Sequence, residues 1–295
     1  MAIPSAVESR SDVRTRVRRR SGWRLLRHRE LVVGGTLVAL VLIVALFAGV
    51  IAPYSPYKPD FANVLQGPSG QHWFGTDVLG RDVFSRILFG ARTSMEVTVG
   101  AAAVGLIFGV PVGLLSGYYG GVVDHWVVMR AVDALQAFPF LVLALVLAAV
   151  LGPGIGNAMI AIGVGYIPGF VRIVRGQAIS EVKKEYVQSA RCVGAGDWRV
   201  MVRHILPNVL SPLIVQVSMA MASGIVAEAS LSYLGLGAQP PTPSWGTMLK
   251  TGQGYLTMAP WLSLAPGLAL VVAVFGFNLL GDGLREWLDP HTSRE

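Results

Sequence analysis

The chain has 295 residues, of which 53% are hydrophobic and only 14% are charged. An ordinary soluble domain carries about a quarter charged residues, and the mean hydropathy here is +0.57. This composition excludes an ordinary soluble fold and predicts a protein embedded in a membrane. The single cysteine, Cys192, excludes an internal disulfide, and the formal net charge is +7.

Uncharged apolar runs of membrane-spanning length follow one another along the chain. A helix needs about 20 mostly apolar residues to cross the hydrocarbon core, and lipid offers no hydrogen-bond partners, so each span must be helical. The run at 134–171 is too long for one span, and a Gly-Pro-Gly-Ile-Gly turn at 152–156 divides it into a helical hairpin. The runs lie at 31–52, 97–123, 134–171, 205–227 and 251–281, and they predict an all-α polytopic protein with six transmembrane helices.

The first apolar run, 31–52, follows an arginine-rich tail at 1–29. The run has 22 residues, whereas the apolar region of a cleaved signal peptide has about 7–15, so we interpret it as a retained first helix. A tail that binds nucleic acid is the alternative. Because arginines directly before a first span set its orientation and contact anionic headgroups, we expect the lipid bilayer, and no nucleic acid, as a partner.

Six spans place both termini on one side of the membrane, and the basic residues indicate which side. Nineteen lysines and arginines fall on the side of the termini and five fall on the other side. Since lysine and arginine favour the cytoplasmic side, we expect a multi-pass protein with both termini in the cytoplasm. Cys192 then lies in a cytoplasmic loop, where thiols stay reduced.

The first outer loop, at 53–93, opens with three prolines that favour an extended backbone. Its second half, 78–92, is amphipathic and predicts a helix lying flat in the membrane interface, with its arginines among the headgroups. A helix that caps the outer end of the bundle is the alternative. The apolar face holds Leu79, Val83, Phe84, Ile87 and Leu88, and the polar face holds Arg81, Asp82, Ser85, Arg86 and Arg92.

The inner loop at 174–208 predicts two short amphipathic helices that meet at a glycine corner, 194–196. Asp197 is a candidate N-cap of the second helix, and Pro207 and Pro212 mark the start of the fifth span. The apolar stripes pack either on the protein's own helix ends or against a cytoplasmic partner. They consist of Val182, Tyr186, Ala190 and Val193 in the first helix and of Trp198, Met201, Val202 and Ile205 in the second.

Several single residues receive an expectation of their own. Glu228 lies near the outer end of the fifth span, where we expect its carboxylate to reach water. Asp124 and Asp133 flank an inner turn and are expected to be solvated. The histidines lie in separate segments without metal-ligand spacing. The glycines of the second span repeat every four residues, which allows close helix packing; they are Gly105, Gly109 and Gly113.

At the inner loop the chain resembles a known family. EYVQSARCVG at 185–194 and HILP at 204–207 resemble the E-A-A…G…I-x-L-P loop of bacterial ABC importer permeases. Three further stretches are similar to the C-type permease subunit of the dipeptide/oligopeptide branch, although nickel permeases share them. These stretches are HWFGTDVLGRD at 72–82, LGLGAQPPTPSWG at 234–246 and GDGLREWLDP at 281–290, and the resemblance covers about 23–290.

The resemblance implies a type I importer permease in the bacterial inner membrane. Half of a pathway for di- or oligopeptides would come from this chain, with a second permease, two cytoplasmic ATPases and an external binding protein as partners. Gln188 departs from the family's glutamate and cannot form its ion pair, whereas Glu185, one turn earlier, offers a substitute. The residues implied in ATPase coupling are Glu185, Gln188, Ser189, Ala190, Arg191, Gly194, Asp197, Leu206 and Pro207.

The sequence contains no G-x-x-x-x-G-K-[ST] phosphate loop, so we expect a transport subunit that is not an enzyme and holds no cofactor, with ATP and magnesium in the partner ATPases. The alternatives are a nickel importer permease and an ion-gradient secondary transporter. The predicted organisation is a basic tail at 1–29, a first helix and outer loop at 30–92, a five-helix core at 93–284 that contains the inner loop at 174–208, and a cytoplasmic tail at 285–295.

Overall fold

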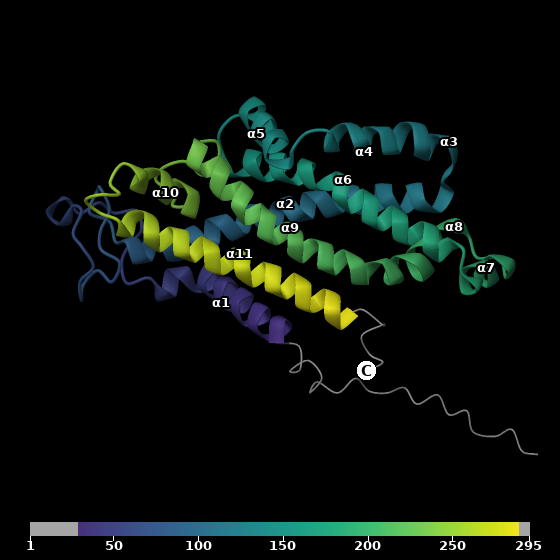
Figure 1. Cartoon of the computed structure of the whole chain (residues 1–295), viewed down its shortest axis with the longest axis horizontal. Coiled ribbons are helices and arrows are strands. Elements are labelled where there is room, and N and C mark those ends of the chain that lie inside the picture. The colour runs from purple at the N-terminus through teal and green to yellow at the C-terminus, as the bar shows by residue number, and fades with distance from the viewer. Residues whose placement is uncertain (1–28, 289–295) are drawn as a thin grey trace, which may run out of the picture.

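The computed structural model describes residues 29–288, which form helices and loops, with one isolated backbone bridge between Thr76 and Asp82. Five helices are long and apolar enough to cross a membrane, and they run along the long axis of the molecule (Figure 1). The basic tail predicted at 1–29 lies outside the described residues, apart from Arg29. The five helices are α1 (Arg29–Ile51), α2 (Val83–Tyr119), α6 (Ile155–Val182), α9 (Leu206–Leu234) and α11 (Trp261–Leu288).

The third predicted span, which begins the run at 134–171, is interrupted at a break that contains Pro139, and the helix before the break starts earlier than predicted, at 121. The two parts, 121–136 and α5 (Phe140–Leu151), are bent by 92°. The predicted turn after α5 is confirmed, because Gly152 and Gly154 have φ values of +87° and +147° that favour glycine. The first half of this span comprises α3 (Gly121–Val123), the π-helix η3 (Asp124–Val128) and α4 (Met129–Gln136).

The repeated glycines of α2 pack against α6, as their spacing predicts. A Cβ atom on Gly109 would lie 2.7 Å from the Cβ of Phe170, and one on Gly113 would lie 2.7 Å from the carbonyl oxygen of Val171. The two backbones therefore approach each other too closely for any side chain at these positions, and α2 and α6 form the central pair of the bundle.

The amphipathic stretch at 78–92 does not form a separate interfacial helix, so that prediction is wrong. α2 begins at Val83, where Asp82 accepts a hydrogen bond from the backbone N–H of Ser85 at 2.7 Å, and it continues to Tyr119. Val83 is fully buried, and Arg86 is only 7% exposed. Arg86 binds Asp77 (Nε–Oδ2 3.4 Å) rather than headgroups, because the loop folds back over the helix start.

The loop at 53–82 and helix α10 (Trp245–Gln253) cover the end of the bundle that we call the outer end, following the predicted orientation; the end with the 183–199 loop is the inner end. The short 3₁₀ helix η2 (Phe61–Asn63) lies in this outer loop. Two indole N–H groups connect these elements to the long helices. Trp245 of α10 donates to the carbonyl of Ile87 in α2 at 3.1 Å, and Trp261 of α11 donates to the carbonyl of Thr76 in the outer loop at 3.2 Å.

Two acidic residues expected to reach water are buried. Asp124 is 5% exposed and binds the Arg175 guanidinium at 2.8 and 2.5 Å, with Ser116 as a further donor. Glu228 is fully buried and accepts hydrogen bonds from the hydroxyls of Ser94 (2.6 Å) and Ser232 (2.7 Å). Both predictions assumed that water reaches these carboxylates, but the closely packed helices exclude it.

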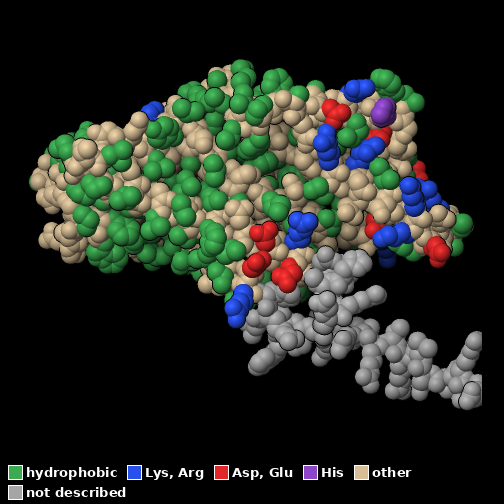
Figure 2. Space-filling model, in the orientation of Figure 1, with side chains coloured by type: hydrophobic (Ala, Val, Ile, Leu, Met, Phe, Trp, Pro, Cys, Tyr) green, Lys and Arg blue, Asp and Glu red, His purple; other side chains and the backbone are tan. Residues whose placement is uncertain are grey.

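Asp133 differs from these two acids. Its side chain is 52% exposed and pairs with Arg172 at 2.5 Å, so the prediction of a solvated carboxylate is confirmed there. Figure 2 shows that charged side chains gather toward the inner end of the visible face, whereas hydrophobic side chains cover its middle. This distribution suits a helix bundle that crosses a bilayer.

Candidate functional site

The inner loop extends beyond the ends of the neighbouring helices (Figure 1). It contains α7 (Glu185–Cys192), and Gly194 follows with a φ of +85°. A glycine in this region ends a helix without the steric cost that a Cβ atom would bring. The predicted corner is therefore confirmed at Gly194.

The second half of the loop is not a separate helix, contrary to the prediction. α8 (Asp197–Arg199) and the π-helix η4 (Val200–Ile205) continue into α9, so that 38 residues from Asp197 to Leu234 form one helical run. Pro207 follows the π-helical turn, where the regular hydrogen-bond pattern is already interrupted, and it does not break the run. The loop is thus joined directly to a membrane helix.

Asp197 is the first residue of α8 rather than its N-cap, and its side chain makes no cap hydrogen bond. Its carboxylate instead accepts hydrogen bonds from the hydroxyls of Tyr118 (2.6 Å) and Tyr119 (3.2 Å), at the inner end of α2. The Arg191 guanidinium lies 4.7 Å from the centre of the Tyr118 ring, a cation–π geometry. These contacts connect the loop to α2, and the sequence analysis missed both tyrosines.

A second set of contacts holds α7 against α6 and α9. The Tyr186 hydroxyl donates to the buried Glu181 carboxylate at 2.5 Å, and the Asn208 amide donates to the Tyr186 oxygen at 3.0 Å. Desolvation and the hydrogen bond to Glu181 raise the pKa of Tyr186 to about 12. The hydroxyl therefore stays protonated and keeps donating throughout the physiological pH range.

The apolar stripes of the loop divide between the protein's own core and the surface. Met201 and Ile205 are buried, as are Val187 and Val200, which were not predicted. Val193 is 85% exposed and Trp198 is 72% exposed. A groove of about 490 Å³ lies beside them, and its lining includes Tyr186, Ala190, Val193, Arg199 and Arg203. Packing on the protein's own helices is thus confirmed for the buried residues, whereas docking of a partner stays a prediction for the exposed ones.

The structure brings most of the predicted coupling residues to one projecting surface. Gln188 donates only a long hydrogen bond of 3.3 Å to the carbonyl of Lys183, and Glu185 has no partner among the described residues. Leu206 and Pro207 lie apart, in the first turn of α9. The exposed residues of the predicted set are Glu185, Gln188, Ser189, Arg191, Gly194, Asp197 and Pro207, and Ala190 and Leu206 are partly exposed.

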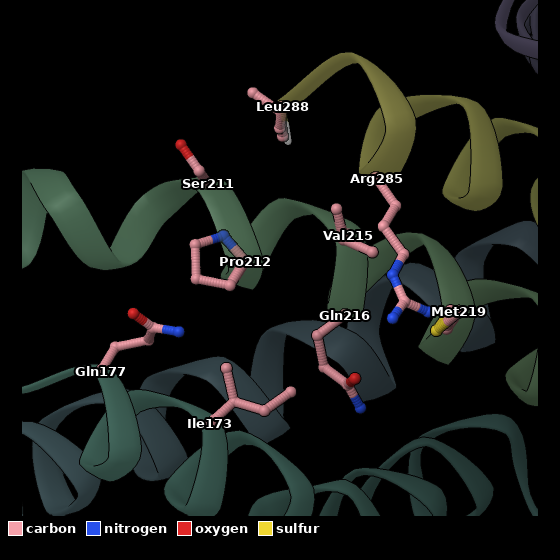
Figure 3. Close-up of a pocket in the computed structure, with 9 residues that line it drawn as sticks. All are labelled: Ile173, Gln177, Ser211, Pro212, Val215, Gln216, Met219, Arg285 and Leu288. Carbon is pink, nitrogen blue, oxygen red and sulfur yellow. The ribbon is translucent and has the colours of Figure 1, made fainter. Parts of the chain in front are cut away.

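Two grooves open beside α9. One, of about 530 Å³, lies between α6, α9 and α11 (Figure 3), and its lining includes Gln177, Gln216 and Arg285. The other, of about 590 Å³, lies between α4, α5, α6 and α9, and its lining includes Gln136, Tyr166, Gln216 and Ser223. Sequence reasoning did not find these positions: Gln136 and Gln216 lie singly in apolar runs and Gln177 lies beyond the end of one, so they give no periodic signal.

A bundle of membrane helices with polar grooves beside one helix and an exposed, partly apolar loop at one end defines a membrane-embedded transport subunit. Residues 109–294 match the family model described as the binding-protein-dependent transport system inner membrane component, and residues 18–68 match the N-terminal TM domain of oligopeptide transport permease C. The chain therefore belongs to the permease family of binding-protein-dependent ABC importers.

Curated relatives and solved structures agree with this assignment. The chain is 43% identical to a glutathione transport system permease protein of Pectobacterium atrosepticum, over 92% of this chain and 90% of the relative. It is 42% identical to a dipeptide transport system permease protein of Alkalihalophilus pseudofirmus over the same shares. In structure it is similar to a chain of the inward-facing MetNI methionine ABC transporter, with a TM-score of 0.57, 18% identity and coverage of 69% of this chain and 96% of that one.

The family membership decides between the functional alternatives left open by the sequence. The chain is a multi-pass permease subunit of an ATP-driven importer and is not an enzyme, because ATP hydrolysis in this family takes place in separate subunits. An ion-gradient transporter that works alone is excluded. The all-α permease fold is confirmed: five helices are long and apolar enough to span a membrane, and the bent pair at 121–151 makes six if it forms one span.

Proposed function

We propose that this chain forms half of a membrane pathway for di- and oligopeptides. The observation that carries the proposal is the 42–43% identity, over 92% of the chain, to permeases named for a dipeptide and for glutathione, itself a short peptide. Nickel is the less favoured cargo. Among the described residues, no three His, Cys, Asp or Glu side chains form a group that would hold a metal ion.

The proposal assigns ATPase coupling to the inner loop, 185–207. Tryptophan is enriched among the anchor residues of protein interfaces, and Trp198 is exposed on this loop, as is the apolar side chain of Val193. Arg199 and Arg203 beside them suit an acidic rim on the partner. Since the loop is bound to α2 through Asp197 and is continuous with α9, a displacement imposed on it passes directly to two membrane helices.

The proposed assembly contains a second permease, two cytoplasmic ATPases that bind ATP and magnesium, and an external binding protein that delivers the cargo. Both termini lie in the cytoplasm. Orientation is tested by cysteine labelling of intact cells in a Cys192→Ser background with an impermeant reagent. Ser69→Cys should react and Ser180→Cys should not, and the reverse pattern contradicts both the orientation and the docking of cytoplasmic ATPases at this loop.

Reconstitution tests the function. We expect proteoliposomes with the complete assembly to take up a labelled dipeptide only with ATP and loaded binding protein, and not to take up nickel. Trp198→Ala should reduce co-purification of the ATPases at least tenfold. Trp126→Ala is the matched control, because Trp126 is also exposed (61%) but lies in η3, outside the loop. Nickel uptake without peptide uptake contradicts the cargo, and equal effects of the two tryptophan variants contradict the coupling role.

A further inference from the structure

Amide side chains on membrane helices need hydrogen-bond partners, because lipid supplies none and an unpaired polar group in hydrocarbon is costly. Two asparagines of the bundle satisfy this requirement. Asn157 donates to the carbonyl of Leu151 at 2.9 Å, and Asn208 donates to that of His204 at 2.7 Å. The side chains of Gln136, Gln177, Gln216 and Asn278, by contrast, have no partner within residues 29–288.

These three glutamines are not scattered. Gln177 lines the groove between α6, α9 and α11, Gln136 lines the groove beside α5, and Gln216 lines both, so the two grooves meet at its side chain. Figure 3 shows Gln177 from α6 and Gln216 from α9 extending into the space between these helices. Gly169 of α6 lies beside the Gln216 side chain, where a Cβ atom would be at an ordinary contact distance of 3.5 Å from the amide nitrogen.

The chemistry of the lining indicates what fills the grooves. An acyl chain would leave all three amides unpaired, so lipid is a poor occupant. An amide offers one acceptor and two donors, which complement the N–H and C=O of a peptide group. Among the described residues that line the two grooves, only Arg285 at the inner end carries a charge. Uncharged amides spaced along the grooves bind a peptide weakly enough that it can be released again.

We propose that the two grooves form one continuous amide groove, in which Gln136, Gln216 and Gln177 hydrogen-bond the backbone peptide groups of the cargo as it passes. This inference rests on the proposed peptide cargo and adds the residues that contact it. Recognition of the backbone makes the pathway indifferent to the cargo's side chains. Specificity among peptides then lies outside the amide groove.

The functional test compares Gln216→Leu, Gln216→Asn and Asn278→Leu in the complete assembly in proteoliposomes. Asn278 is the matched control, because its amide on α11 is also without a partner among the described residues but lines neither groove. With a labelled tripeptide and loaded binding protein, Gln216→Leu should lower the peptide transported per ATP hydrolysed about five- to tenfold. Gln216→Asn should restore part of it, and Asn278→Leu should change it less than twofold.

A second measurement does not depend on how tightly ATP hydrolysis is coupled to transport. In the Cys192→Ser background, Gln216→Cys and Gln177→Cys should react with a water-soluble thiol reagent, and tripeptide during turnover should slow both reactions. The reaction of Asn278→Cys should not respond to the tripeptide. Unreactive cysteines at 216 and 177, which indicate lipid or a protein surface in the groove, overturn the inference, as does reaction without protection.

The two proposals fail in different ways. If the wild-type assembly transports no peptide at all, the proposed function fails and the amide groove loses its cargo. If the wild type transports peptide and Gln216→Leu transports it as efficiently, with no protection of Gln216→Cys, the amide groove alone is wrong.

Discussion

The loops at the outer and inner ends of the bundle differ in how closely they pack against it. At the outer end, the loop at 53–82 folds back over the start of α2 and buries its charges, and Asp77 there binds both Arg81 (2.7 Å) and Arg86 (3.4 Å). At the inner end, α7 projects from the bundle, and Val193 and Trp198 stay exposed. Both loops nevertheless continue directly into membrane helices.

This difference separates the stability of the subunit from its assembly. The polar side chains of the outer loop are paired with groups of the same subunit, which is typical of a region that is stable without a partner protein. Gly80 illustrates the closeness of its packing, because a Cβ atom there would lie 1.7 Å from the carbonyl oxygen of Asp60. The inner loop leaves apolar surface uncovered, which indicates a partner interface. Damage to the outer end should therefore unfold the subunit, and damage to the inner end should uncouple it.

The largest effect is expected at the outer end, from Asp77→Ala. This change leaves the buried Arg86 without a carboxylate, and removing one partner of a buried ion pair costs about 3–5 kcal/mol. We expect little folded protein in the membrane, measured by yield and by thermal unfolding in detergent. Asp133→Ala is the control, because its pair with Arg172 is half-exposed and worth about 0–1 kcal/mol. Equal stability of the two variants contradicts this part of the comparison.

Gly194→Arg should abolish transport while the protein still inserts. A side chain at φ +85° strains the corner by about 1–2 kcal/mol, and the arginine adds a bulky charge to the docking surface. Co-purification of the ATPases and peptide uptake measure the effect. Gly196→Arg adds the same charge at a φ of −67°, without backbone strain, and should retain more activity. Normal assembly and transport by Gly194→Arg would show that this loop is not the coupling element.

A smaller, more specific effect is expected from Asp197→Asn. The amide keeps the size of the side chain but removes its charge, which weakens the hydrogen bonds from Tyr118 and Tyr119. We expect ATPase binding to persist while transport per ATP falls severalfold. The double variant Tyr118→Phe with Tyr119→Phe should reproduce this loss. A loss of ATPase binding instead of coupling would place Asp197 in the docking surface.

Gln188→Glu should have the smallest effect, a gain of less than about twofold in transport or none. It restores the glutamate that the family pattern has at this position, but an exposed ion pair contributes only about 0–1 kcal/mol. The measurement is ATPase affinity and uptake relative to wild type, and Glu185→Gln tests whether the neighbouring acid already makes the contact. A large gain from Gln188→Glu would show that the departure from the family pattern weakens coupling.

Sequence patterns predicted those parts of the site that depend on local conformation. The corner at Gly194 and the turn at 152–154 were predicted correctly, because glycine and proline act on their own backbone. Asp197 was assigned as an N-cap because its type and position fit one, but Tyr118, 79 residues away in sequence, competes for its carboxylate. No pattern within the inner loop contains that partner.

The amino-acid sequence by itself determined the membrane class, the all-α fold and the family, since these follow from the length of apolar runs and from motifs. Only the tertiary structure decided where helices begin, which charges are buried and which amides stay unpaired. The stretch at 78–92 has the amphipathic pattern of a surface helix, and Glu228 has the position of a solvated acid. Burial and pairing depend on neighbours that are distant in sequence, and folding alone brings them together.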